Sequence, residues 1–160
     1  MVASTLASAE RSPLVPQRRP VTGGGDARRS DTESAAPSVL IAEDHADSRD
    51  ALRALLEAFG YRVFTAGDGH EAVAEARAHH PDLILMDMMM PGMDGMEATR
   101  TLRADPDFPR IPIVAVTAME GSRERVLSAG CDDWVAKPIN IRAFLARVPE
   151  WLGSTRSEAS

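Results

Sequence analysis

Short apolar runs alternate with amphipathic stretches along the chain from Ser38 onward. Each run is continuously apolar, which is typical of strands that are covered on both faces in a parallel sheet. A half-exposed strand would instead alternate polar and apolar residues. The pattern predicts five strands, at residues 39–42, 63–66, 83–86, 113–116 and 134–136.

The stretches between these runs have the spacing of helices. In the first, a large apolar residue recurs every three or four positions between Asp47, the expected cap, and Gly60, the expected end. The expected helices lie at about 47–59, 70–80, 94–104 and 122–129, and a fifth, capped by Asn140, reaches Leu152. Five strand–helix units predict an α/β fold with a five-stranded, doubly wound parallel sheet of the flavodoxin-like (βα)5 class.

The two ends of the chain differ from this regular middle. Residues 1–37 contain four prolines, a triple glycine and few large apolar residues, so the segment cannot bury enough surface to offset its ordering entropy. We expect a disordered leader there, which composition favours over a partner-binding tail. The expected domain covers residues 38–152, and residues 153–160 are expected to be a flexible C-terminal tail.

Composition and charge exclude several classes of protein. The chain has 160 residues, of which 44% are hydrophobic, and its net charge of −6 disfavours nucleic acid or an anionic membrane as a partner. Its single cysteine, Cys131, forms no internal disulfide, which fits a reducing cytoplasm. No apolar run approaches the roughly 20 residues of a membrane span, and Glu10 and Arg11 interrupt any secretory signal. We therefore expect a cytoplasmic protein.

Candidate chemistry gathers where the expected strands end. Glu43 and Asp44 follow the first strand, Asp87 the third, Thr117 the fourth, and Lys137, the chain's only lysine, the fifth. The carboxyl ends of parallel strands meet at one edge of the sheet, where ligands bind in such folds. Three carboxylates in contact repel one another unless a cation lies between them. Oxygen ligands without histidine or cysteine favour Mg²⁺, or Mn²⁺, over zinc.

The remaining two side chains suggest a phosphoryl group. A threonine hydroxyl and a lysine ammonium suit phosphoryl oxygens better than a bare metal ion. A carboxylate would then be the nucleophile and would form an aspartyl-phosphate. Taken singly, each residue has a structural explanation: a helix cap for Glu43 or Asp44, β-propensity for Thr117, a solvated surface position for Lys137. The combination at four strand ends favours the functional interpretation.

Four segments resemble the receiver domains of bacterial response regulators, over about residues 38–152. They read VLIAED at 39–44, LILMDMMMPGMDG at 83–95, IVAVTA at 113–118 and GCDDWVAKPI at 130–139. Their order and spacing match the family throughout. The resemblance implies a single-domain response regulator whose phosphorylation switches a protein–protein interaction surface.

The resemblance also implies a role for individual residues. Asp87 accepts the phosphoryl group from a sensor histidine kinase or a histidine phosphotransfer protein. Asp44 ligates Mg²⁺ directly and Glu43 does so largely through water. Asp87 is also a metal ligand, and the backbone carbonyl of Met89 supplies a further oxygen.

The phosphoryl-binding and switch residues are implied in the same way. Thr117 and Lys137 bind the phosphoryl oxygens, and the Lys137–Pro138 bond is cis. Trp134 occupies the position of the switch aromatic, where the family usually has Tyr or Phe.

Other interpretations stay open at this point. A Mg²⁺-dependent phosphatase of the haloacid dehalogenase type needs a second aspartate two residues after the nucleophile, where this chain has Met89, so that function is disfavoured. A receiver module separated from a hybrid kinase, or one that no longer phosphorylates, is a further alternative. The downstream protein target is unnamed, and a phosphorylation-dependent homodimer is left open. The methionines after Asp87 are interpreted as core filling in preference to an oxidation sensor.

Overall fold

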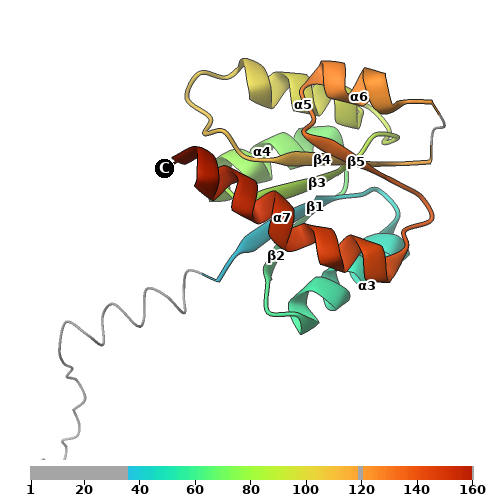
Figure 1. The fold of residues 1–160 in the computed structure, drawn as a ribbon. Helices are drawn as coiled ribbons and strands as arrows, with labels where there is room; N and C mark the ends of the chain where they lie inside the picture. Colours follow the sequence, from blue (N-terminus) through green and yellow to red (C-terminus); the bar gives the residue numbers. More distant parts are fainter. Residues whose placement is uncertain (1–35, 119–120, 160) are drawn as a thin grey trace, which may run out of the picture. The chain divides into compact units, whose positions relative to one another are not determined.

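Five parallel strands pair into one sheet with the order β2-β1-β3-β4-β5 (Figure 1). The computed structural model describes residues 36–118 and 121–159. The strands are β1 (Ser38–Ala42), β2 (Arg62–Ala66), β3 (Leu83–Asp87), β4 (Ile113–Thr117) and β5 (Asp133–Ala136). All five predicted strands are confirmed. The chain goes from β1 outward to β2 and then returns to the other side of β1, so the strand order reverses between β1 and β3.

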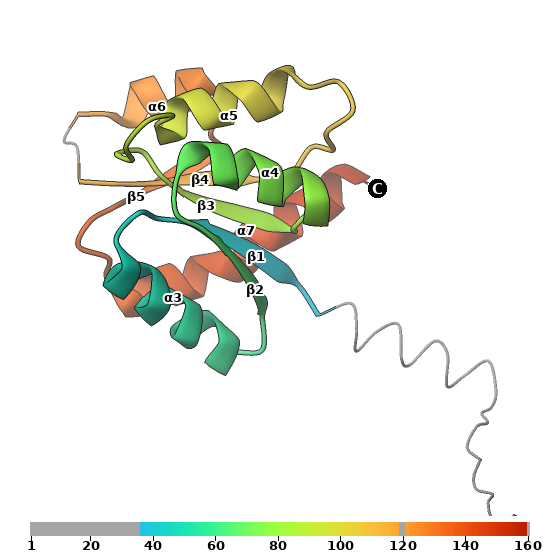
Figure 2. The same cartoon turned by 180° about the vertical axis from the view of Figure 1, so that it is seen from behind.

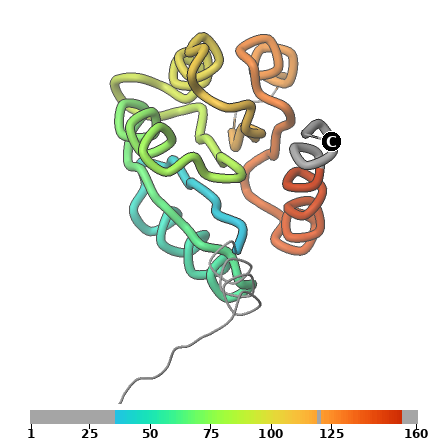
Figure 3. Tube along the Cα trace, turned by 90° about the vertical axis from the view of Figure 1, so that its left-hand side faces the viewer, coloured from blue at the N-terminus to red at the C-terminus, as the bar shows by residue number. Residues whose placement is uncertain are grey.

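Helices cover both faces of this sheet. Figures 1 and 2 show α3 and α7 on one face of the sheet and α4, α5 and α6 on the other. Figure 3 shows the same arrangement after a turn of 90° about the vertical axis. The helices are α3 (Ala46–Ala58), α4 (Gly69–His79), α5 (Gly95–Ala104), α6 (Arg123–Ala129) and α7 (Ile141–Ala159). The predicted doubly wound α/β fold is therefore confirmed.

The ends of α3 differ in part from the prediction. Asp47 was expected to cap this helix, but α3 begins one residue earlier, at Ala46, with His45 at the N-cap and Asp47 in the first turn. The reason is that the His45 carbonyl already accepts the helical hydrogen bond from Arg49 N–H, at 2.9 Å. Asp47 still favours the helix, because a carboxylate near the N-terminus complements the helix dipole. At the other end, Gly60 has a φ of +94°, as expected of a glycine that terminates a helix.

The last helix is longer than predicted. The fifth helix was expected to reach Leu152, but α7 continues to Ala159. A helix that is already nucleated and docked adds each further residue at little cost. Gly153 opposes this extension by only about 1 kcal/mol relative to alanine.

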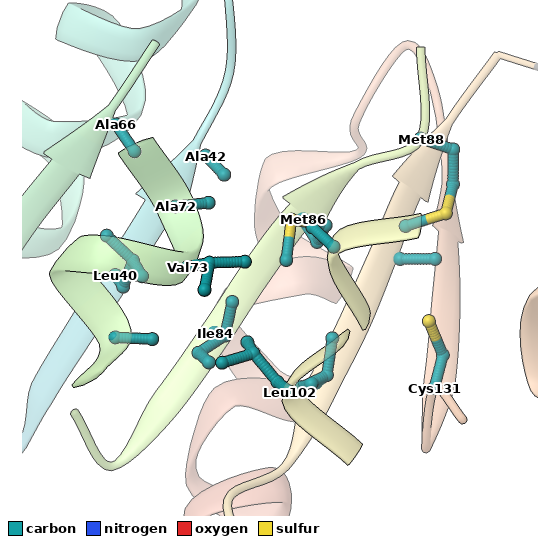
Figure 4. Packing of buried hydrophobic residues seen from close by; sticks show 14 of the residues in the cluster. Leu40, Ala42, Ala66, Ala72, Val73, Ile84, Met86, Met88, Leu102 and Cys131 are labelled. Atoms are coloured by element: carbon teal, nitrogen blue, oxygen red, sulfur yellow. The ribbon is translucent and has the colours of Figure 1, made fainter. Parts of the chain in front are cut away.

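Successive residues of the central strands enter two separate cores. Leu83 and Leu85 pack with α3 and α7, together with Phe144 and Trp151. Ile84 and Met86 belong to the other core, with residues of α4, α5 and α6 (Figure 4). Because both faces of the sheet are buried in this way, the strands are continuously apolar, and their ends are held rigidly.

A boundary separates the domain from the segment before it. The second unit of the chain begins at Pro37, and β1 begins at the next residue. Residues 1–35 of the expected leader lie outside the described residues. Within the part of the chain that is described, no helix has the length and apolar character to cross a membrane.

Candidate functional site

The predicted side chains lie at the carboxyl edge of the sheet, on neighbouring strand ends. Glu43 and Asp44 follow β1, Asp87 is the last residue of β3, and Thr117 is the last residue of β4. Lys137 follows β5, and its backbone N–H donates to the Thr117 carbonyl at 2.9 Å. The strand order reverses between β1 and β3, so the two acidic strand ends flank the switch point where ligands bind in doubly wound sheets.

Three carboxylates meet at this point. Glu43, Asp44 and Asp87 each offer a carboxylate oxygen, and these oxygens lie within 4.8 Å of one another. Glu43 is only 7% exposed and Asp87 only 4%, whereas Asp44 is exposed. Like charges this close raise the free energy of the site, and burial of two of them adds to that cost.

Lys137 supplies the positive charge that the buried carboxylates need. Its Nζ donates to Glu43 Oε1 at 2.9 Å and to Asp87 Oδ2 at 3.1 Å. The Lys137–Pro138 peptide bond is cis, as the resemblance predicted. One ammonium thus joins the ends of β1 and β3 to the loop after β5.

Backbone groups satisfy the remaining oxygens of the two buried carboxylates. Glu43 Oε2 accepts from His45 N–H at 3.0 Å, and Asp87 Oδ1 accepts from Met89 N–H at 2.9 Å. Arg49, on α3, donates from Nη1 to the Glu43 carbonyl at 2.9 Å and so fixes the turn between β1 and α3. These three donors were not predicted from the sequence.

The surroundings shift the pKa values of Glu43, Asp87 and the half-buried Lys137 in different directions. Burial and the charge of Glu43 raise the pKa of Asp87, and hydrogen bonds from Met89 N–H and Lys137 do not fully offset this rise. Burial also raises the pKa of Glu43, but hydrogen bonds from Lys137 and His45 N–H outweigh it and lower the pKa. Burial lowers the pKa of Lys137, yet its two carboxylate partners raise it overall. The surroundings therefore favour the protonated form of Asp87 and the ionised form of Glu43, each relative to its ordinary state.

A cleft opens over the acidic cluster. Its volume is about 280 Å³, and it is lined by Glu43, Asp44, His45, Ser48, Asp87, Met89, Ala118 and Lys137. A larger, mostly apolar groove of about 690 Å³ shares Glu43, Asp87 and Lys137 with it and extends along α3 to Leu55. The cleft gives small ligands access to Asp87, and the groove lies beside that access.

Two predicted residues stand apart from the cleft lining. Thr117 is buried at the end of β4, with 1% of its surface exposed. Trp134 is half-buried and packs against the core shared with α4, α5 and α6. The structure therefore brings Glu43, Asp44, Asp87, Met89 and Lys137 together around one cleft, with Thr117 at the adjacent strand end and Trp134 one strand further out.

Comparison with known proteins identifies the family. Residues 39–149 match the response regulator receiver domain, so the chain belongs to the response regulator receiver family. The family serves phosphorylation-based signalling, and the resemblance seen in the sequence is confirmed. The match assigns the chain to this signalling family and not to the dehalogenase-type phosphatases.

Particular relatives resemble the chain over most of its length. It is 42% identical over 118 residues to the polar-differentiation response regulator DivK of Brucella ovis, covering 72% of this chain and 96% of that protein. It is also similar to the receiver domain of the sensor histidine kinase PA1611 from Pseudomonas aeruginosa, which has a magnesium ion coordinated in its active-site cleft. That structure has a TM-score of 0.67 and 40% identity, over 74% of this chain and 98% of the other.

A third relative is known in a complex. It is the receiver domain of the Saccharomyces cerevisiae response regulator Ssk1, crystallised with the histidine phosphotransfer signalling protein Ypd1. The TM-score is 0.66 and the identity 28%, over 72% of this chain and 88% of that chain.

Proposed function

We propose that the chain is a Mg²⁺-dependent phosphoacceptor, in which Asp87 receives a phosphoryl group from a phosphohistidine and thereby switches a protein-binding surface. The observation that carries this proposal is the pairing of Asp87 with Lys137 beside two further carboxylates at the switch point of the sheet. A purely structural cluster would not need three acids facing a cleft that water can enter.

The donor set fits a divalent cation. Three carboxylates face one ammonium, so the cluster carries an excess of negative charge, and all of its ligand atoms are hard oxygens. Asp44, Asp87 and the Met89 carbonyl would hold Mg²⁺ or Mn²⁺, with Glu43 acting through water. When bound, the ion supplies positive charge that offsets the charge of the incoming phosphoryl oxygens.

Several residues of the chain would then take part in phosphoryl transfer to Asp87. An Asp87 carboxylate oxygen forms a bond to phosphorus while the phosphorus–nitrogen bond of the phosphohistidine breaks, and the imidazole leaves with the bonding electrons. Lys137, already 3.1 Å from Asp87 Oδ2, stabilises the transferred oxygens. The Thr117 hydroxyl contributes a further hydrogen bond, and Trp134 relays the change toward α6.

The phosphoryl donor would be a sensor histidine kinase or a histidine phosphotransfer protein. The groove beside the cleft offers apolar side chains of α3, such as Leu52 and Leu55, next to Asp87 itself. A donor helix seated there would bring its histidine over the cleft. The complex of the Ssk1 receiver domain with Ypd1 supports a donor of this kind.

The test is phosphorylation by a small donor. Incubation with acetyl phosphate and Mg²⁺ should add one phosphoryl group, detected by mass spectrometry and located on Asp87. Asp87→Asn should take up none. Asp94→Asn is the matched control, because Asp94 lies in the same loop but only caps α5, accepting from Glu97 N–H at 2.9 Å. Equal labelling of Asp87→Asn would refute the proposal.

A further inference from the structure

The methionines at the end of β3 and in the loop after it differ sharply in exposure. Met86, Met88 and Met90 are 0%, 2% and 6% exposed, as expected of core filling. Met89 is 58% exposed. Among the methionines in the described parts of the chain, it is the one that core packing does not explain.

Met89 also lies beside the phosphoacceptor. Met89 is one of the residues that line the 280 Å³ cleft, together with Asp87 and Lys137. Its backbone N–H is bonded to Asp87 Oδ1 at 2.9 Å, which keeps the residue next to that carboxylate. Any chemical change of the Met89 thioether therefore takes place at the mouth of the site.

We propose that Met89 is a site of reversible oxidation, and that its sulfoxide shortens the lifetime of the phosphoryl group on Asp87. The oxidant is of the hydroperoxide class, with hydrogen peroxide as the simplest member. The effect on phosphoryl lifetime rests on the proposed function, whereas the oxidation of Met89 needs no phosphorylation.

The oxidation step is a two-electron oxygen transfer. The thioether sulfur attacks one peroxide oxygen, a sulfur–oxygen bond forms, and the oxygen–oxygen bond breaks. The departing hydroxide takes up the proton left on the transferred oxygen, so one peroxide yields one sulfoxide and one water. Methionine sulfoxide reductases reverse the change in general.

The effect on phosphoryl lifetime follows from the chemistry of the cleft. A volume of about 280 Å³ admits several water molecules, and water that hydrolyses the acyl phosphate must approach through it. The thioether of Met89 is a weak acceptor and covers part of this approach with apolar surface. A sulfoxide oxygen is a strong acceptor that can hold and orient the attacking water. One added hydrogen bond in the transition state corresponds to about fivefold faster loss of phosphate.

The first experiment measures selectivity. The full chain is treated with dilute hydrogen peroxide, and each methionine is followed by peptide mapping. Met89 should be oxidised several times faster than Met88 and Met90, its direct neighbours in the sequence. Equal rates for the three residues in the folded protein would overturn the inference.

The second experiment measures lifetime. Protein phosphorylated with acetyl phosphate is freed of donor, and the loss of phosphate is followed before and after oxidation. Wild type should lose phosphate about fivefold faster after oxidation, and methionine sulfoxide reductase should restore the original rate. In Met89→Leu, the rate of phosphate loss should be the same before and after peroxide treatment. Met89→Gln, which has an amide oxygen at similar reach, should show the faster rate without peroxide.

The controls separate this inference from the proposed function. Met119 lies outside the described residues, so Met119→Leu is tested in parallel and should keep the full response. Loss of the response in Met119→Leu but not in Met89→Leu would overturn the inference. An unchanged lifetime in phosphorylated protein with oxidised Met89 would do so as well and would leave the proposed function standing. Failure of unoxidised wild type to take up phosphate would instead refute the proposed function and the second half of the inference.

Discussion

Lys137 holds the site together through a single ammonium group. It donates to two buried carboxylates that would otherwise repel each other, Glu43 at 2.9 Å and Asp87 at 3.1 Å. Burial has already raised the pKa of Asp87, and the lysine limits that rise. The charge state of Asp87, the proposed phosphoacceptor, therefore depends on one side chain that lies 50 residues later in the chain.

Replacing Lys137 by methionine should raise the pKa of Asp87 further, because a nearby positive charge favours the ionised carboxylate. A carbon-detected NMR titration of the Asp87 carboxyl in Mg²⁺-free buffer measures this. Arg53→Met is the control, since Arg53 pairs with Glu57 on the exposed side of α3. An Asp87 pKa that stays the same or falls in Lys137→Met would contradict the argument.

Asp44 should contribute more to Mg²⁺ affinity than Glu43. Both Glu43 carboxylate oxygens already accept hydrogen bonds, from Lys137 and from His45 N–H, whereas Asp44 is exposed and has no hydrogen-bond partner among the described residues. Calorimetric titration should show that Asp44→Asn weakens binding by about tenfold or more, a loss typical of altered metal sites. Glu43→Gln should cost clearly less. Comparable losses in the two variants would count against this assignment.

The side chains of the site could be predicted from the sequence, but its backbone donors could not. Asp87, Thr117 and Lys137 were predictable because parallel strands end at the same edge, whatever the loops do. The N–H groups of His45 and Met89 carry no residue-specific signal. Their contacts depend on loop conformation, which only the folded structure shows.

At the scale of elements, α5 packs very closely on the end of β3. A Cβ atom at Gly95, the first residue of α5, would lie 2.2 Å from the Asp87 carbonyl oxygen and 2.8 Å from Met88 Cα. Both neighbours are backbone atoms, which cannot rotate away. The absence of a side chain at Gly95 thus allows the helix to pack directly against the end of β3, where Asp87 lies.

Gly95→Ala should therefore destabilise the fold by about 1–3 kcal/mol and slow phosphorylation, because overpacking displaces the strand end. Gly153→Ala is the matched control: Gly153 lies in α7, and nothing is within 4 Å of its would-be Cβ. That change should stabilise the protein by about 0.5–1 kcal/mol. Urea unfolding followed by circular dichroism compares the two. If Gly95→Ala were as stable as wild type, the close approach of α5 to the Asp87 carbonyl would not be needed, and the argument would be wrong.

The ends of helices were harder to predict than their existence. All five helices could be located from apolar spacing in the first and fifth, and from the stretches between strands and their end signals in the others. The start of α3 and the end of α7 depend on single backbone hydrogen bonds and on the small cost of adding a further helical residue. The residue types at these two positions do not strongly determine where a helix begins or ends.

At the scale of the whole molecule, the sheet divides the interior into two cores. Cys131 lies in the core of α4, α5 and α6, with its Sγ 3.8 Å from Thr99 Oγ1. Burial raises the pKa of the Cys131 thiol to about 11. Since the chain has one cysteine, its reactivity reports on the opening of this core.

A thiol reagent at pH 8 should react with native Cys131 about 100-fold or more slowly than with a free cysteine, because few molecules carry an exposed thiolate. The rate should rise to the free value as urea unfolds the protein. The double variant Cys131→Ala, Ser128→Cys moves the thiol to the exposed side of α6 and should react quickly without urea. Rapid reaction of native wild type would show that this core opens readily.

The position of Lys137 in the chain also sets the order in which the site is made. Its partners lie 94 and 50 residues earlier, so a growing polypeptide contains Glu43 and Asp87 long before their counter-charge is synthesised. Contacts of such long range form late in folding, because closing large loops costs entropy first. A nascent domain that lacks β5 therefore carries an acidic edge without its lysine. If Asp87 is the phosphoacceptor that we propose, its site is complete only after β5 docks, and a partly synthesised domain should not yet accept a phosphoryl group.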